Sequence, residues 1–221
     1  LKCRSSAGTN WGAFDSERGA TKVLLQDSTA AEGTEADTLT AFESDGFALG
    51  AQSNYNTNTA THVAYSWLAG TNFDNDASAT SVGTIDSDGQ INEDAGFSII
   101  KYEGTGSAGT IAHGLSKAPQ MIIFKNRDAT AAWTVYHENM QASDPADVQM
   151  DLNGTGALYN DARYYNDTEP TATVMSVNDY VDNNGSGNSH VAYCFHDVDG
   201  YSKFGSYIGN GSAEGPFIYC G

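Results

Sequence analysis

Apolar residues along this chain gather in short runs that are separated by turn-forming residues. Met121–Lys125, Phe97–Tyr102 and His190–Phe195 are rich in β-branched and aromatic residues, and Gly, Asn, Asp and Ser cluster between such runs. This pattern is typical of β-strands joined by hairpin turns. Helical periodicity is weak, and a turn or two near residues 144–150 is the only helical candidate. The pattern predicts an all-β fold with little helix, a sandwich of jelly-roll or concanavalin-like type.

One stretch of sequence occurs twice. His62-Val63-Ala64-Tyr65-Ser66-Trp67 returns as His190-Val191-Ala192-Tyr193-Cys194-Phe195, with the first four residues identical and an aromatic residue at the end of both. Such self-similarity indicates that one structural unit is repeated. Further landmarks accompany both copies in the same order: Lys2–Arg4 and Lys125–Arg127, Trp11 and Trp133, Gly96–Ser98 and Gly200–Ser202, Tyr102–Gly109 and Tyr207–Gly215.

The repeat predicts two tandem β-sandwich units, residues 1–119 and 120–221. The first unit begins without the Pro119–Phe124 lead-in of the second, so we expect the chain to be a piece of a longer tandem array. Residues 71–95 have no counterpart in the second unit and are rich in Asp, Asn, Ser and Thr. We interpret them as an insertion that forms a surface loop or a short hairpin.

Charge narrows the classes of function. The chain has 28 acidic and 10 basic residues, for a net charge of −18. Nucleic acids and anionic membrane surfaces are bound mainly through Lys and Arg, which are scarce here. No apolar run approaches the roughly 20 residues of a membrane-spanning helix. We therefore expect neither nucleic-acid binding nor membrane insertion. Three cysteines without a Cys-x-x-Cys pair do not indicate a disulfide-stapled scaffold.

One acidic segment has a composition that Ca²⁺ favours. Asp86, Asp88, Asn92 and Asp94 would supply several hard oxygen ligands within a short stretch. The segment lacks the EF-hand spacing, and a solvated acidic turn is the simpler interpretation. Calcium at these four residues stays as the alternative, and no other cofactor is expected.

Catalytic motifs are weak. Carboxylate pairs for glycoside hydrolysis carry little information in so acidic a chain, and no nucleophile elbow is present. Gly104–Gly109 matches a phosphate-binding pattern by letter, but no helix pattern follows it, so we expect a hairpin loop. Asp15, four positions after Trp11, is replaced in the second copy by His137, four positions after Trp133. A scaffold that repeats while its reactive groups change indicates that the protein is not an enzyme.

Aromatic residues are the remaining candidates for contact with a ligand or partner. Tyr164 and Tyr165 lie among polar residues that include Asn160 and Asn166. Such surroundings favour an exposed loop, in which tyrosine rings can stack on sugars or on a partner protein. We take these four residues as the predicted binding site.

In combination, the landmarks resemble a known type of domain. The Lys-x-Arg strand, a following Trp, Phe42–Phe47, the His-Val-Ala-Tyr strand and His113–Pro119 occur in order. This series resembles a repeated β-domain of large virion proteins of marine bacteriophages, especially those that infect cyanobacteria. The resemblance covers most of the chain outside residues 71–95, but it supplies no catalytic residues.

The resemblance implies a non-catalytic virion structural protein, a tail-fibre or appendage segment that displays loops for attachment to the host. It implies an extracellular or virion location and partners that include copies of the chain itself, with a trimer as the fibre form, other virion proteins and a host-surface glycan or protein. A carbohydrate-binding module or bacterial surface adhesin, stabilised by calcium in the acidic loops, is the alternative. A depolymerase ranks last.

Overall fold

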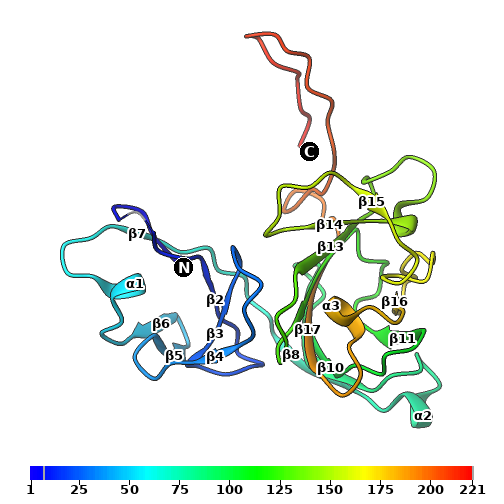
Figure 1. Cartoon of the computed structure of the whole chain (residues 1–221), viewed down its shortest axis with the longest axis horizontal. Coiled ribbons are helices and arrows are strands. Elements are labelled where there is room, and N and C mark those ends of the chain that lie inside the picture. Colours follow the sequence, from blue (N-terminus) through cyan, green and yellow to red (C-terminus); the bar gives the residue numbers. More distant parts are fainter. Residues whose placement is uncertain (7, 221) are drawn as a thin grey trace.

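The computed structural model describes residues 1–6 and 8–220. Strands make up 34% of the chain and helices 7%, which confirms the all-β prediction. Figure 1 shows a smaller N-terminal lobe, a larger lobe built around one wide sheet, and a C-terminal segment that projects away from both.

Eight antiparallel strands form the wide sheet of the larger lobe. Each pairs with its neighbours in the order β15-β14-β13-β12-β17-β10-β9-β8. In that order the strands are Tyr159–Asn160, Val148–Asp151, Trp133–His137, Met121–Asn126, Ser189–Phe195, Phe97–Glu103, Ser87–Asn92 and Thr71–Asn75.

Smaller pairings and short helical turns complete the fold. β11 (Gly109–Ala112) pairs with β16 (Val174–Val177) beside the wide sheet. The N-terminal lobe contains the pairs β1-β7 and β5-β6 and the three-stranded sheet β2-β3-β4. The strands of the two pairs are β1 (Lys2–Cys3) with β7 (His62–Val63), and β5 (Leu39–Glu43) with β6 (Gly46–Leu49). Those of the three-stranded sheet are β2 (Gly12–Ala13), β3 (Lys22–Leu25) and β4 (Gly33–Thr34). The helices are α1 (Ser53–Asn56), α2 (Ala77–Thr80), α3 (Val181–Asn184) and a 3-10 turn over Pro145–Asp147.

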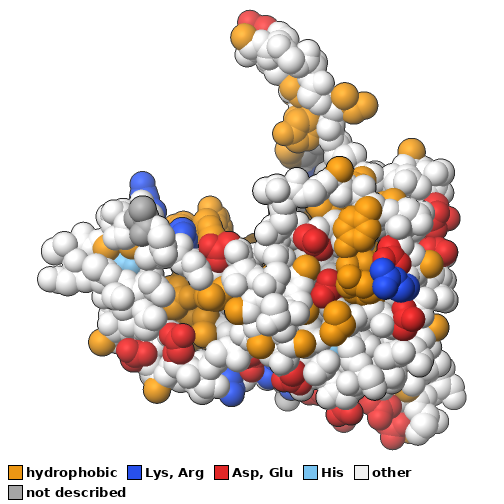
Figure 2. Space-filling view, viewed as in Figure 1, with side chains coloured by type: hydrophobic (Ala, Val, Ile, Leu, Met, Phe, Trp, Pro, Cys, Tyr) orange, Lys and Arg blue, Asp and Glu red, His pale blue; other side chains and the backbone are white. Residues whose placement is uncertain are grey.

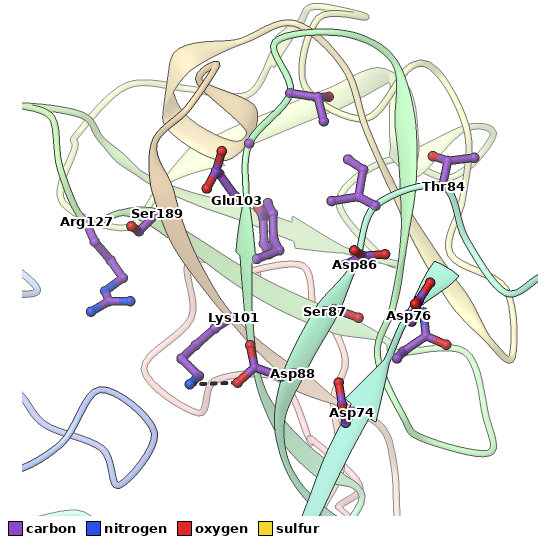
Figure 3. Close-up of a pocket in the computed structure, with 15 residues that line it drawn as sticks. Asp74, Asp76, Thr84, Asp86, Ser87, Asp88, Lys101, Glu103, Arg127 and Ser189 are labelled. Atoms are coloured by element: carbon purple, nitrogen blue, oxygen red, sulfur yellow. Dashed lines mark ion pairs between the residues drawn. The ribbon is translucent and has the colours of Figure 1, made fainter. Parts of the chain in front are cut away.

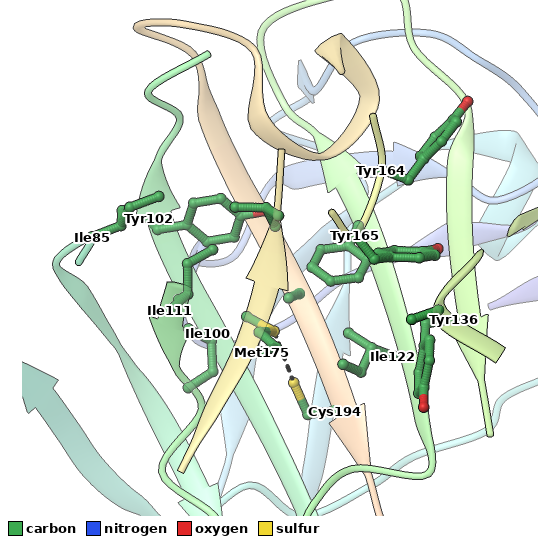
Figure 4. Close-up of a cluster of buried hydrophobic side chains, with 14 of the residues drawn as sticks. Ile85, Ile100, Tyr102, Ile111, Ile122, Tyr136, Tyr164, Tyr165, Met175 and Cys194 are labelled. Atoms are coloured by element: carbon green, nitrogen blue, oxygen red, sulfur yellow. Dashed lines mark hydrogen bonds between the residues drawn. The ribbon is translucent and has the colours of Figure 1, made fainter. Parts of the chain in front are cut away.

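Each face of the wide sheet carries a cluster of buried apolar side chains. Successive side chains of a strand point to opposite faces, so one strand contributes to both clusters. On β10, Ile100 and Tyr102 join the core that β11 and β16 cover. Figure 4 shows these two side chains in that core together with Met175 of β16. Phe97 and Ile99 point to the other face and pack with Leu24 of β3. The N-terminal lobe therefore covers one face of the sheet, and each fully buried aliphatic side chain there contributes about 1.5–3 kcal/mol.

The expected pair of separate sandwiches is not confirmed. β17 lies between β10 and β12 in the wide sheet, so strands from both sides of the 119/120 boundary belong to one sheet. β17 is apolar on both of its faces and needs a neighbour on each edge as well as cover above and below. Residues 71–95 also differ from a simple surface loop: they contribute β8, α2 and β9, an antiparallel pair that extends the wide sheet.

The sequence repeat is nevertheless a structural repeat. Residues 1–67, the N-terminal repeat, follow the same path as residues 124–195, the C-terminal repeat: β2, β3, β4, β6, α1 and β7 correspond to β13, β14, β15, β16, α3 and β17. β1 pairs with β7 as β12 pairs with β17, in matching register. The paired residues are Lys2–Val63 and Cys3–His62 in the N-terminal repeat, and Lys125–Val191 and Asn126–His190 in the C-terminal repeat.

Hydrogen bonds outside the strands repeat too. The backbone carbonyl of Trp11 accepts from Gln26 N at 2.9 Å, and that of Trp133 accepts from Leu152 N at 2.8 Å. The lysine ammonium of each repeat donates to the carbonyl two positions before its tryptophan, that of Thr9 for Lys2 and that of Ala131 for Lys125. The aromatic stacks Trp11–Tyr65 and Trp133–Tyr193 have centroid separations of 6.2 and 6.4 Å, both at 20°.

Candidate functional site

The predicted tyrosine site is not a surface site. Tyr164 and Tyr165 are only 1% and 3% exposed, because residues 161–168 fold over one face of the wide sheet. The Tyr165 ring packs 5.9 Å from that of Phe124, and the Tyr164 hydroxyl lies 2.6 Å from that of Tyr159. These two tyrosines belong to the core, and their pKa values are raised by burial.

The two asparagines predicted beside them are exposed. Asn160 ends β15 at the edge of the wide sheet, and Asn166 takes a left-handed conformation with φ of 55°. Asn tolerates that conformation better than most residues, which explains a turn at this place. Asn160 and Asn166 thus face solvent while the rings of Tyr164 and Tyr165 point into the core. The types of the neighbouring residues do not show which of these side chains are buried.

The predicted calcium ligands do not converge. Residues 87–92 form β9 rather than a loop, so Asp86 and Asn92, six positions apart, are separated by roughly 20 Å. Asp86 accepts from the backbone N of Ala77 at 2.9 Å, and Asp88 forms an ion pair with Lys101 at 2.8 Å. Within the described residues, no three His, Cys, Asp or Glu side chains form a group that could hold a metal ion. The geometry therefore does not support a calcium site at these four residues.

An open acidic cleft of about 770 Å³ lies beside β8, β9 and β10. Several of its carboxylates are engaged in local contacts: Asp76 caps α2, Asp86 accepts from Ala77 N, and Asp88 pairs with Lys101, which also pairs with Glu17 at 3.1 Å. No nucleophile hydrogen-bonded to a base lies among the residues that line it. Figure 3 shows Asp74, Asp76, Asp86, Asp88, Glu103, Lys101 and Arg127 around the cleft.

A buried network of charges joins the two lobes. The Arg18 guanidinium donates to Asp15 at 2.5 Å and to Glu32 at 3.0 Å, and Arg127 at the end of β12 donates to the same Glu32. Burial alone would raise the pKa of Asp15, but Arg18 and the Tyr193 hydroxyl, 2.6 Å away, outweigh it and lower that pKa. The network fixes the N-terminal lobe against β12 and β17.

The C-terminal repeat has no such acid at the matching position. His137, the counterpart of Asp15, is half-buried at the end of β13 and accepts a hydrogen bond from Asn139 N at 3.0 Å. Buried ion pairs of this kind are specific in geometry rather than strongly stabilising. We therefore assign the Asp15 network to the packing of the lobes rather than to catalysis.

The most exposed aromatic residues lie elsewhere, outside the four residues of the predicted binding site. After β7 the chain exposes Tyr65 by 65% and Trp67 by 58%, whereas their counterparts in β17 lie within the wide sheet. The C-terminal segment exposes Tyr207 by 69% and Phe217 by 91%. Figure 2 shows apolar side chains along this projecting segment. The signal in the sequence was the repeat itself, which marked both segments as strand-like.

Among the described residues, no helix has the length and apolar character needed to cross a membrane. The chain belongs to a family described as a domain of unknown function, DUF7483, whose model matches residues 1–221. Neither the curated proteins nor the solved structures include a match to it.

Proposed function

We propose that this member of the DUF7483 family is a non-catalytic structural protein of an extracellular assembly, a virion appendage such as a bacteriophage tail fibre. The observation that carries the proposal is the structural repeat: two copies of one β unit share strand register, lysine contact and aromatic stack. The side chains that could act in acid–base chemistry are not shared by the two repeats: Asp15 of the first is replaced by His137 in the second. A scaffold repeated without its reactive groups serves better as building material than as a catalyst.

In this proposal the repeats hold polar loops outward for contact with a host-surface glycan or protein. Asn160 and Asn166 keep this role, since both are exposed, and Tyr159, 41% exposed, replaces Tyr164 and Tyr165 as the aromatic contact. Weak contacts of single loops become strong when many copies of the chain present them together. The charge of −18 keeps such a crowded assembly from aggregating.

The proposal is tested by cell binding and by turnover, measured on the same preparation. Fluorescently labelled chain is added to a panel of cyanobacterial cells and to a glycan array, and release of reducing ends from the cell polysaccharide is followed in parallel. We expect saturable binding that unlabelled chain displaces, without release of reducing ends. A Tyr159→Ala variant should bind more weakly, and a Tyr201→Ala variant serves as the exposed aromatic control. Release of reducing ends, or no binding to any cell or glycan, would contradict the proposal.

A further inference from the structure

The segment that follows the N-terminal repeat completes the C-terminal repeat. β10 pairs with β17 along seven residues, with Lys101 opposite Val191 and Tyr102 opposite His190. β11 then pairs with β16 on the next layer. The turn between them, Gly104–Gly109, donates backbone hydrogen bonds from Gly104 to Asn188 O and from Gly106 to Asn184 O. Residues 97–112 thus cover two strand edges of a repeat that they precede in the chain.

Within the described residues, β7 and β6 of the N-terminal repeat have no strand in the place of β10 and β11. Within residues 1–6 and 8–220, β7 pairs with β1 alone, whereas its counterpart β17 pairs with β10 as well as with β12. β6 pairs with β5, whereas its counterpart β16 pairs with β11. The consequence is visible at the histidines. His190 stacks on Tyr102 at 5.1 Å and accepts from Gly185 N, whereas Nε2 of His62 is buried without a hydrogen-bond partner. Open edges with unpaired backbone groups are ready to accept a strand.

The projecting C-terminal segment repeats the spacing of the turn that follows β10. Tyr207, Gly209 and Gly211 repeat the spacing of Tyr102, Gly104 and Gly106, and Gly106 and Gly211 have the same φ of 66°. A glycine is required at the second position of the series, because a Cβ on Gly104 would lie 2.2 Å from Gly185 O. A Cβ on Gly209 would meet no atom within 4 Å beyond its two neighbours in the chain. The segment therefore repeats the spacing of the turn after β10 but has no partner strand beside it.

We infer that residues 205–219 of one copy of the chain pair with β7 and β6 of a second copy, as β10 and β11 pair with β17 and β16. This names a self-assembly site and its partner, and it rests on the proposed function only for its biological setting. By equivalence, Ser206 lies opposite Val63, Tyr207 stacks on His62, and Gly209 approaches the backbone after α1. The contact is heterologous, a strand added to a sheet edge, so repetition produces a ring or an open filament.

Disulfide trapping tests the contact and its register. In a Cys220→Ser background, a Val63→Cys chain is mixed with a Ser206→Cys chain under mild oxidation, and the mixed disulfide is followed by mass spectrometry. The matched control replaces Val63→Cys by Ala64→Cys, whose side chain points to the opposite face. We expect the first pair to form the mixed disulfide about tenfold faster or more. Equal rates, or no disulfide between separate chains, would overturn the inference.

A second measurement uses the requirement for glycine. Sedimentation velocity over a range of concentrations should show association of the unmodified chain. Gly209→Val should lower the association constant about tenfold or more, because its side chain would meet backbone. Gly205→Val is the matched control: its counterpart is Ile100, a buried core residue, so association should persist. A monomer at all concentrations, or equal effects of the two variants, would refute the contact whatever the result of the cell-binding assay.

Discussion

The two repeats make the same local contacts but differ in how far those contacts are buried. In the C-terminal repeat, Trp133 stacks on Tyr193 and is 1% exposed, since β3 covers it on one side and its indole donates to Leu25 O at 2.8 Å. In the N-terminal repeat, Trp11 stacks on Tyr65 in the same geometry, yet Tyr65 is 65% exposed. The comparison teaches that a repeat specifies its own strand pairing, while burial depends on what lies beside it.

The largest expected difference between the repeats concerns the tryptophans. Trp133→Ala should lower the free energy of unfolding by about 3–5 kcal/mol, since it leaves a cavity in the core and removes the hydrogen bond to Leu25 O. Trp11→Ala should cost about 1 kcal/mol, because its ring is only half-buried. Urea unfolding of both variants provides the comparison. Equal losses would mean that the N-terminal repeat is as well covered as the C-terminal one.

An intermediate effect is expected for the glycines of the two turns. Gly104→Ala should destabilise the chain by about 1–3 kcal/mol, because a Cβ there meets Gly185 O and the ring of His190. Gly209→Ala should leave the unfolding free energy of the monomer unchanged, since the added Cβ would meet no atom within 4 Å beyond its chain neighbours. Thermal unfolding at low protein concentration, where chains stay apart, separates the two. A destabilised Gly209→Ala monomer would show that the C-terminal segment packs on its own chain.

The smallest expected difference lies in the pH dependence of the lysines. Lys125 is buried beneath Thr29 O and Ala131 O, and burial lowers its pKa from 10.5 to about 8. Between these values the unfolded chain holds more protons, so this group adds stability as the pH rises through that window and adds least below about pH 8.

Lys125→Met should abolish this rise, on the order of 1 kcal/mol after allowance for solvent screening, and Lys2→Met should retain it. The measurement is the free energy of unfolding in urea at several values between about pH 7.5 and about pH 10, taken as the difference from the unmodified chain. A rise that survives in Lys125→Met would assign it to another group.

Sequence reasoning captured the strands and the repeat, because both are local. Alternation and β-branched runs identified Phe97–Tyr102 and His190–Phe195, and both are strands of the wide sheet. It failed for Tyr164 and Tyr165, whose neighbours are polar although the rings are core. It also failed for the acidic segment at Asp86–Asp94, where closeness along the chain was read as closeness in space and an extended strand separates the ligands instead.

What the sequence alone determined is the unit: its strand-forming runs, its turns and the spacing that repeats after the unit ends. Only the tertiary structure decided which strands share a sheet, since a strand edge carries the same backbone donors and acceptors whatever its neighbour. β17 pairs with β10 as well as with β12 and lies inside the wide sheet. The segment that begins with β7 shares the sequence His-Val-Ala-Tyr with β17, but β7 pairs with β1 alone among the described residues. Backbone hydrogen bonds are the same for every pair of strands, so the packing of side chains far apart in the sequence decides which strands become neighbours.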